Sequence, residues 1–243
     1  MKNRWTSGLL AMALLASVPM TALAAENRQP VISPTPILIS QEVQTFSDVS
    51  DDHWAASQIR QMTDLGVMTP DGEGRFSPDR AVTRAEVVDA LWRLSGKPVV
   101  NYLMTFKDVQ QGSETAEAIR WAAAEKISGG YSADWFGAAD TVTREQLATI
   151  LYRYVQKFDM GFKGMWMFPL NYTDVADMAE WASEPVHWMV ANHLMQGKGE
   201  CLLPKGTLTR AQEAVMLSRL LDVAAKKDVH FENYSSRGDV TQQ

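Results

Sequence analysis

One pattern occurs three times along this chain, and this repetition constrains the fold more than any other feature. The first landmark begins with Thr-Arg and is found at 83–86, 143–146 and 209–212. The second is an aromatic residue followed by x-Asp-Val, found at 46–49, 106–109 and 172–175. For both landmarks, the first two copies are 60 residues apart and the last two are 66 residues apart. This matched spacing indicates tandem structural repeats, which we place at 46–96, 106–157 and 172–223.

Each Thr-Arg segment has the sequence of a helix capping box. In this motif the Thr hydroxyl accepts from the backbone N–H three residues later, and a Glu or Gln at that position reaches back to the N–H of the Thr. The capping residues are Thr83, Thr143 and Thr209, and their partners are Glu86, Gln146 and Gln212. Apolar residues at helical spacing follow each box, so we predict an amphipathic helix that starts there.

A second apolar helical segment precedes each box and ends at glycine, the usual residue after a helix. These glycines are Gly66, Gly129-Gly130 and Gly197. A single helix–loop–helix unit cannot bury its apolar face alone, so the three copies must pack together. We therefore predict an all-α fold, in which three pseudo-symmetric helix–loop–helix repeats surround a central three-helix bundle. The capping-box helices form this bundle, and the clefts between repeats contain the loops and helix starts.

The arginine in each box is an unusual choice, because a cation in the first turn opposes the helix macrodipole. These residues are Arg84, Arg144 and Arg210. One explanation is that each guanidinium, together with nearby backbone N–H groups, binds an anion such as a carboxylate. The other is that each arginine pairs with an Asp or packs on a Trp. The anion hypothesis predicts that Arg144→Ala leaves stability nearly unchanged, whereas Thr143→Ala costs about 1 kcal/mol.

The two ends of the chain differ from the repeats. Basic residues, a short apolar run at 9–18 and an Ala-x-Ala sequence predict a Sec-type signal peptide over 1–24. Residues 25–45 contain three prolines and are interpreted as a spacer, and 224–243 as a loose polar tail. We therefore expect an exported mature chain that lies at the cell wall and has no transmembrane segment.

Charge and composition argue against several classes of function. Without the leader the chain has 21 basic and 29 acidic residues, a net charge of −8, and it shows no basic stripe, so we expect no nucleic-acid binding. The single cysteine, Cys201, cannot form an intrachain disulfide. Because no catalytic motif or metal-ligand spacing is present, we predict no enzyme activity, catalytic residue, cofactor or metal site.

The repeated landmarks resemble the S-layer homology domain. In the first repeat the resemblance rests on 46–49, His53-Trp54-Ala55, Gly66-Val67, Phe76-x-Pro78 and 83–86. It extends over all three repeats and implies a three-pronged structure around a central helical bundle. It also implies that the clefts bind secondary cell-wall polysaccharide carrying acidic pyruvate ketals, and that the three arginines meet the acidic sugar.

The candidate ligand-binding residues are therefore Arg84, Arg144, Arg210, Thr83, Thr143, Thr209, Gly130, Gly197, Trp54, Trp121 and Trp181. The three tryptophans have two interpretations, because they could stack on sugar rings or belong to the core. Pro70 stands where the other repeats have Gly130 and Gly197, and proline removes a backbone N–H. We therefore rank the cleft of Arg84 below those of Arg144 and Arg210.

The expected function is that of a non-catalytic envelope protein that attaches to the wall through this polysaccharide. Two alternatives stay open. One is binding of polyamine-modified peptidoglycan, as in similar domains of some diderm relatives. The other is an anchor subunit for an envelope enzyme or structural assembly, with an unidentified envelope protein as partner. The apolar joint at 158–171 is expected to pack on the bundle.

Overall fold

The computed structural model describes residues 45–231, except 73 and 165–166. The expected signal peptide, the spacer apart from Thr45, and residues 232–243 of the tail lie outside the described residues. The repeats lie in the unit formed by residues 42–243, and only this unit is described below.

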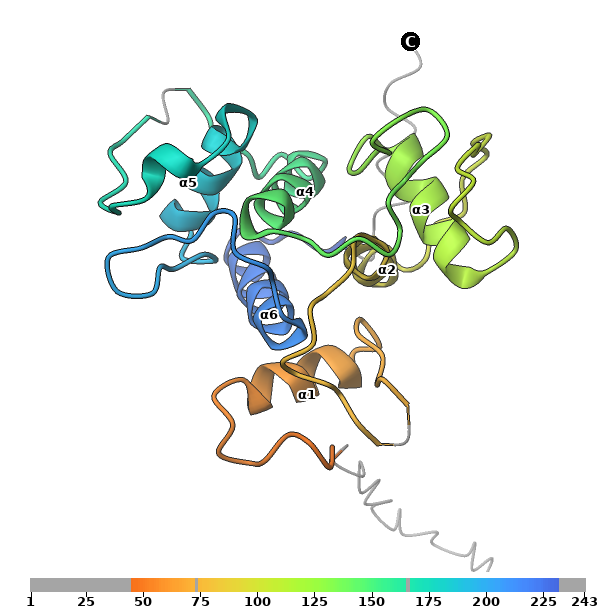
Figure 1. Cartoon of the computed structure of the whole chain (residues 1–243), viewed down its shortest axis with the longest axis horizontal. Helices are drawn as coiled ribbons and strands as arrows, with labels where there is room; N and C mark the ends of the chain where they lie inside the picture. The colour runs from red at the N-terminus through yellow and green to blue at the C-terminus, as the bar shows by residue number, and fades with distance from the viewer. Residues whose placement is uncertain (1–44, 73, 165–166, 232–243) are drawn as a thin grey trace, which may run out of the picture. The chain divides into compact units, whose positions relative to one another are not determined.

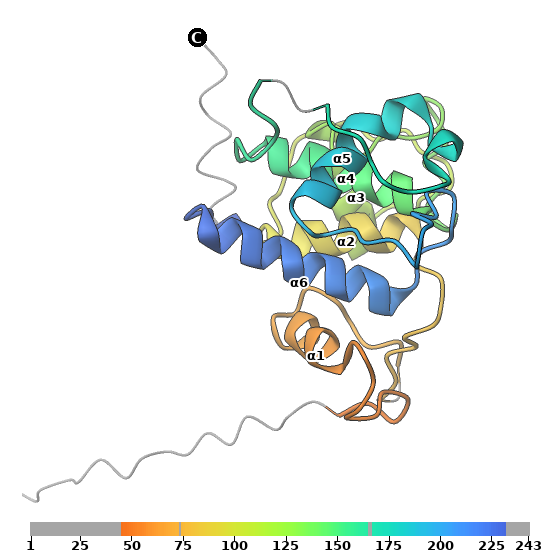
Figure 2. The ribbon, with the colours of Figure 1, turned by 90° about the vertical axis from the view of Figure 1, so that its left-hand side faces the viewer.

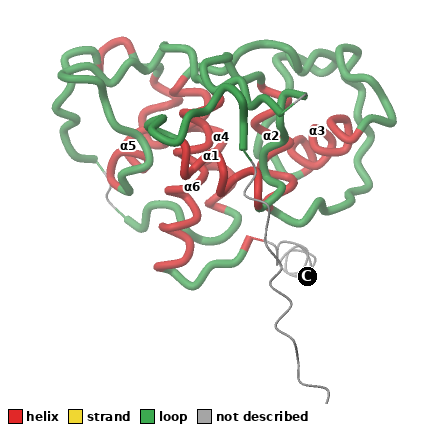
Figure 3. The backbone as a smooth tube through the Cα atoms, turned by 90° about the horizontal axis from the view of Figure 1, so that it is seen from below, coloured by secondary structure: helices red, strands yellow, loops and turns green. Residues whose placement is uncertain are grey.

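Within the described residues the regular structure is helical, which confirms the all-α prediction (Figure 3). The α-helices are α1 (Ala56–Asp64), α2 (Arg84–Leu94), α3 (Glu114–Ala124), α4 (Arg144–Gln156), α5 (Ser183–Ala191) and α6 (Arg210–Lys226). Two short 3₁₀ turns, η1 (Val175–Asp177) and η2 (Glu180–Ala182), precede α5. The β-type contacts in the same residues are isolated bridges.

The capping boxes form as the sequence predicts. Thr83, Thr143 and Thr209 are the residues immediately before α2, α4 and α6. Each hydroxyl accepts from the backbone N–H three residues later, and the Glu or Gln at that position bonds back to the capping residue. Because two of the N–H groups at each helix start are satisfied within four residues of sequence, the start of each helix is set locally.

The helices pack between repeats and not only within them. The second helix of one repeat lies against the first helix of the next, so that α2 packs on α3 and α4 on α5. The last helix closes the arrangement, since α6 packs on α1 (Figure 2). Figure 1 shows α2, α4 and α6 on the inside and α1, α3 and α5 on the outside. Each of these three α-helix pairs is thus built from two different repeats.

A ring of backbone hydrogen bonds joins the three repeats where the capping-box helices begin. The N–H of Val82 donates to the carbonyl of Leu208, that of Leu208 to Val142, and that of Val142 to Val82, each at 3.0 Å. The three donors and acceptors close a triangle. This confirms the prediction that the helix starts lie together and surround a pseudo-threefold axis.

The joint and the start of the tail contribute to the core. Phe158 and Met160 are buried and Phe162 packs partly on the core, whereas Met167 is 78% exposed and Phe168 36% exposed, so only part of the joint packs as expected. Phe231 lies in the tail that we predicted to be loose, yet it is buried, and its ring centroid is 5.1 Å from that of Tyr154 and 4.8 Å from that of Phe158. The prediction of a loose tail is therefore wrong at Phe231, because an aromatic ring gains more from this packing than from solvent exposure.

Candidate functional site

The aspartate of each aromatic-x-Asp-Val landmark holds the loop before the capping box. The carboxylate of Asp108 accepts from the backbone N–H groups of Phe136, Gly137 and Ala138 at 2.7–2.8 Å. Asp48 and Asp174 accept in the same way from their own loops. Although burial opposes it, these backbone bonds hold the pKa of Asp108 below its ordinary value. The loops are thereby fixed with their carbonyl groups facing the helix starts.

Each repeated arginine reaches into the loop of another repeat. Arg84 donates from Nε to the carbonyl of Phe136 at 3.2 Å and from Nη2 to that of Gly129 at 2.7 Å. The same two groups of the other arginines bond to Leu202 and Gln196 for Arg144, and to Phe76 and Thr69 for Arg210. The arginines therefore connect one repeat to the next, in addition to any contact with a ligand.

Aromatic rings cover two of these guanidinium groups. The Cζ atom of Arg84 lies 4.5 Å from the ring centre of Tyr131 and 4.9 Å from that of Phe136. That of Arg210 lies 4.5 Å from the ring centre of Phe76. Burial lowers the pKa of Arg84 and Arg210 below the ordinary value. The partners that sequence reasoning considered were Asp and Trp, but the structure places backbone carbonyls and Phe or Tyr rings there, together with Glu86 at Arg210.

The backbone part of the expected anion site is wrong. The N–H of Arg84 donates to the carbonyl of Asp140 at 2.9 Å, and that of Ala85 donates to Ala138 at 3.1 Å. The corresponding N–H groups of α4 and α6 donate to loop carbonyls in the same manner. Because the capping Thr takes the third group, these helix starts offer no free N–H in the first three positions. An anion at these helix starts must therefore bind through groups other than these three N–H groups.

An open cleft lies beside Arg84 and has a volume of about 190 Å³; we call it the Arg84 cleft. It combines the arginine of the first repeat, the glycine loop and α4 of the second, and Trp181 of the third. Its lining residues are Arg84, Ser128, Gly129, Gly130, Tyr131, Gln146, Thr149, Ile150, Arg153 and Trp181. Two of these residues are cationic and none is acidic, so the lining favours an anionic ligand.

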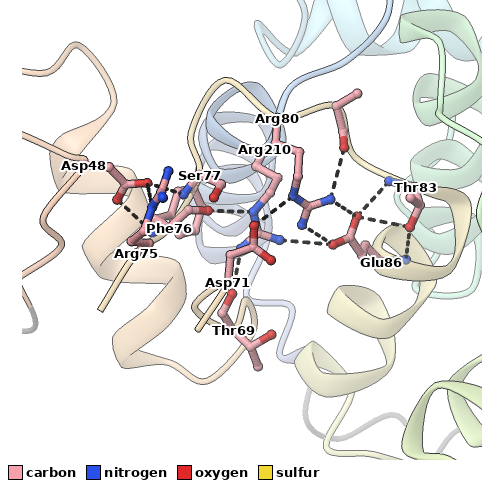
Figure 4. A network of polar contacts seen from close by, with 11 residues as sticks. Asp48, Thr69, Asp71, Arg75, Phe76, Ser77, Arg80, Thr83, Glu86 and Arg210 are labelled. Carbon is pink, nitrogen blue, oxygen red and sulfur yellow. Dashed lines mark hydrogen bonds and ion pairs between the residues drawn. The ribbon is translucent and has the colours of Figure 1, made fainter. Parts of the chain in front are cut away.

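The cleft beside Arg210, the Arg210 cleft, has a volume of only about 30 Å³ and an acidic lining. Glu86 pairs there with Arg80 at 2.5 Å and with Arg210 at 3.4 Å (Figure 4). Glu213 is 1% exposed, and neither of its carboxylate oxygens has a hydrogen-bond partner among the described residues. Burial raises the pKa of Glu213 to about 8. The remaining lining residues are Val67, Met68, Thr69, Asp89 and Ala90.

The loop that contains Pro70 belongs to the Arg210 cleft. Arg210 bonds to the carbonyl of Thr69, directly before Pro70, whereas Arg84 bonds to that of Gly129. Our sequence-based ranking assumed that Pro70 and Arg84 share a cleft because they share a repeat. This assumption is wrong, since each cleft pairs an arginine with the loop of another repeat.

Gly130 and Gly197 are required by close packing. A Cβ atom on Gly130 would lie 2.4 Å from the carbonyl oxygen of Trp135 and 2.6 Å from the ring of Phe106. On Gly197 it would lie 2.4 Å from the ring of Tyr172. In the second and third repeats the aromatic residue of the landmark thus packs so close to the glycine that a larger residue would not fit there. Gly130 also lines the Arg84 cleft, and a ligand-binding role for both glycines stays a prediction.

The three candidate tryptophans lie in different environments. Trp54 is 61% exposed and Trp181 is 55% exposed. Trp121 has no exposed surface and meets the ring of Tyr154 edge-on, with centroids 6.2 Å apart. We therefore correct the assignment of Trp121, which belongs to the core, since helical position alone could not distinguish the two interpretations. Trp181 lines the Arg84 cleft.

Sequence reasoning missed a second repeated arginine. Arg93, Arg153 and Arg219 each stand ten residues after a capping Thr. The signal was available, because these residues follow the same spacing as the two landmarks. Only Arg153 of the three lines the Arg84 cleft.

A model of one known family matches the segments that contain these repeated features. The model of the S-layer homology domain matches residues 45–88, 105–148 and 171–213. The chain belongs to the S-layer homology (SLH) family. Each match overlaps one of the three predicted repeats, and each includes one aromatic-x-Asp-Val landmark and one capping box.

Similar proteins carry SLH repeats as a small part of a longer chain. A cellulosome-anchoring protein of Acetivibrio thermocellus is 26% identical over 159 residues, which cover 61% of this chain and 34% of that protein. The surface-layer 125 kDa protein of Lysinibacillus sphaericus is 27% identical over 77% of this chain and 16% of its own length. An amylopullulanase of Thermoanaerobacterium thermosulfurigenes is 28% identical over 73% of this chain and 10% of its own length. This SLH chain therefore matches at most about a third of each of these three relatives.

Two further observations concern the part of this SLH chain that the structure describes. None of its helices there combines the length and the apolar character needed to cross a bilayer. No three His, Cys, Asp or Glu side chains gather there in a way that could hold a metal ion.

Proposed function

We propose that this SLH protein attaches to the cell wall without catalysis, by binding an acidic wall polysaccharide in the Arg84 cleft. The observation that carries the proposal is the pair of arginines in an open cleft whose lining contains no acid. An arginine–carboxylate contact is charge-assisted and directional, which suits the acidic group of a sugar. Trp181, exposed at the same cleft, offers a ring face to the apolar side of a sugar.

The relatives and the expected leader are consistent with this proposal. Two of the relatives are named for anchoring a cellulosome and for forming a surface layer. The predicted signal peptide at 1–24 would deliver the protein to the outside of the cell. We propose that the cell surface is its location, and that pyruvylated secondary polymer is the ligand.

The three clefts are proposed to contribute unequally. The Arg84 cleft ranks first because it is open and cationic. Arg144, which donates to two backbone carbonyls, is placed second, and the Arg210 cleft ranks last because it is small and because Glu86 and Asp89 oppose an anion there. This order replaces the one based on Pro70. The hydroxyls of Thr83, Thr143 and Thr209 already accept the capping bonds. A ligand could contact them only through the hydrogen-bonding capacity that these bonds leave.

The test is sedimentation of the protein with purified wall sacculi. Gly129→Leu should fill the Arg84 cleft without a clash, because a Cβ atom on Gly129 meets nothing within 4 Å. We expect this variant to stay folded and to remain in the supernatant. The matched control is Thr69→Leu, at the corresponding position of the Arg210 cleft, which should sediment like the parent. If the folded Gly129→Leu variant still sediments like the parent, the Arg84 cleft does not bind the wall.

The acidic lining of the Arg210 cleft supports one alternative, binding of polyamine-modified peptidoglycan. Glu86 and Asp89 would then face an ammonium group instead of an anion. In that case sedimentation would survive chemical removal of the secondary polymer, and would be lost on sacculi that lack the amine. Glu86→Gln would weaken binding more than Gly129→Leu does.

A further inference from the structure

A second hollow lies beside the Arg84 cleft, between α4 and the start of α5, and has a volume of about 480 Å³. Its lining includes Thr149, Arg153, Gln156, Glu180, Trp181 and Glu184. Thr149, Arg153 and Trp181 also line the Arg84 cleft. The two hollows therefore meet along these three side chains, and a ligand that fills one reaches the edge of the other.

Arg153 at this shared edge differs from its counterparts in the other repeats. The guanidinium of Arg93 pairs with Asp89 at 2.7 Å and with Glu114, and Arg219 donates to the carbonyl of Leu194 at 3.3 Å. Arg153 is exposed, and it makes no ion pair or hydrogen bond with any residue that the structure describes. Its whole donor fork is therefore available to a ligand.

Arg84 can offer only part of its donor groups. Its Nε and Nη2 groups already donate to the carbonyls of Phe136 and Gly129, and the side chain is stacked on two rings. The paired contact that a carboxylate favours needs two neighbouring N–H groups on one edge of the guanidinium. At this site both edges of the Arg153 guanidinium are available, whereas Arg84 keeps only the edge formed by Nη1 and the second N–H of Nη2.

The second hollow has the lining of a site for uncharged hydroxyl groups. Gln156, Glu180 and Glu184 present amide and carboxylate oxygens, which accept from hydroxyls, and the carboxylates would repel an acid. Glu184 is held in place by the hydroxyl of Tyr152, which donates to its Oε1 atom at 2.6 Å. The hollow therefore suits a neutral part of a ligand whose acidic group lies at Arg153.

We propose that the Arg84 cleft and this hollow form one groove for an acidic saccharide of at least two sugar units. Arg153 pairs with the acidic group at the shared edge, and Trp181 lies against the sugar that crosses it. The inference rests on the proposed function, and it adds the minimum length of the ligand and the residue that pairs with its charge.

The experiment compares Arg153→Ala and Arg153→Lys with Arg93→Ala and Arg219→Ala, the same position in the other repeats. The probes are wall sacculi and size-fractionated acidic oligosaccharides released from them, used as competitors of sedimentation. We expect Arg153→Ala to weaken binding about tenfold or more, and Arg153→Lys to restore only part of it, because a point charge lacks the fork. Both control variants should bind like the parent. A fragment of two or more units should compete better than a single sugar against the parent, and this advantage should shrink in Arg153→Ala.

The outcomes separate this inference from the function on which it rests. If Gly129→Leu loses binding while Arg153→Ala binds like the parent, the wall-binding cleft stands and the role of Arg153 is overturned. Equal competition by one-unit and longer fragments would overturn the two-unit groove. If both variants bind like the parent, the proposed function itself fails. Thermal unfolding of each variant checks that a loss of binding is not a loss of fold.

Discussion

The Arg84 cleft and the Arg210 cleft are built from the same repeated parts, yet they differ in charge and in space. One has a volume of about 190 Å³ and two arginines, and the other has about 30 Å³ and three acids. Gln146 and Thr149 of α4 line the first, whereas Glu86 and Asp89 occupy the same helix positions in the second. The comparison shows that the fold preserves a cleft's architecture while a few side chains decide what it can bind.

The difference continues at Arg153 and its counterpart Arg93. Arg93 is paired with Asp89 and Glu114, and Glu114 stands where the first repeat has Trp54. Around the Arg210 cleft, Glu114 thus stands at the position of an aromatic residue, and its carboxylate pairs with Arg93. Around the Arg84 cleft the arginine stays unpaired among the described residues and the aromatic residue, Trp181, is kept. Pseudo-symmetry of the backbone therefore does not predict equal function.

The largest expected effect is a loss of protein stability when the buried arginine of the Arg210 cleft is replaced. Arg210→Ala should lower the free energy of unfolding by about 3–5 kcal/mol, because it removes two buried bonds to carbonyls and one of the two cations that pair with Glu86, which keeps only Arg80. Arg144→Ala, at the half-buried position, should cost about 1–3 kcal/mol. Urea unfolding of both variants measures this, with the exposed Arg75→Ala as control. Unchanged stability of both would favour the purely ligand-binding role that the sequence suggested.

The second prediction concerns Glu213, which stands where the other repeats have Val87 and Leu147. Glu213→Leu should raise stability by about 1–3 kcal/mol near neutral pH, because it removes a buried carboxyl that lacks a hydrogen bond among the described residues. The matched control is Leu147→Met, a volume-conserving change at the same position of α4, which should cost less than about 1.5 kcal/mol. A loss of stability in Glu213→Leu would mean that the carboxyl has a favourable partner.

The pH dependence of the same residue gives an independent check. Burial raises the pKa of Glu213 from 4.5 to about 8, so the folded state holds a proton that the unfolded chain releases. The contribution of this group to stability therefore falls as pH rises through this interval. Denaturant titrations at pH 5, 6.5 and 8 should show the decline in the parent, and a smaller decline in Glu213→Leu. Parallel curves would show that Glu213 does not titrate in this range.

The smallest effect on stability is expected for the exposed tryptophan of the open cleft. Trp181→Ala should change the free energy of unfolding by no more than about 0.5 kcal/mol, yet it should weaken sedimentation with wall sacculi. Trp54→Ala is the matched control, since Trp54 is equally exposed but lines neither of the two clefts compared here. Equal binding losses in the two variants would show that the difference between the clefts does not decide wall binding.

Much of the candidate site could be predicted from the sequence, but not its assembly. The Thr-Arg boxes, the glycines and Trp181 were singled out from repetition and from their resemblance to the family, but the sequence did not tell whether Trp181 is exposed or buried. Arg153 was missed, although it follows the same spacing as the other repeated residues. An arginine near the C-terminal end of a helix does not oppose the helix macrodipole, so nothing in its local sequence makes it unusual. Glu213 could have been found as a charged residue at an apolar position of its repeat.

By itself, the sequence determined where the second helix of each repeat begins, because the capping bonds join residues only three apart. It also determined the all-α class and the tandem repeat, through apolar spacing and matched landmarks. Only the tertiary structure decided which loop meets which arginine, because those bonds join residues 45 to 141 positions apart. Packing between repeats likewise buried Trp121, left Trp181 at a cleft and placed Pro70 beside Arg210. Such contacts depend on how the last helix closes on the first, and no local pattern specifies that.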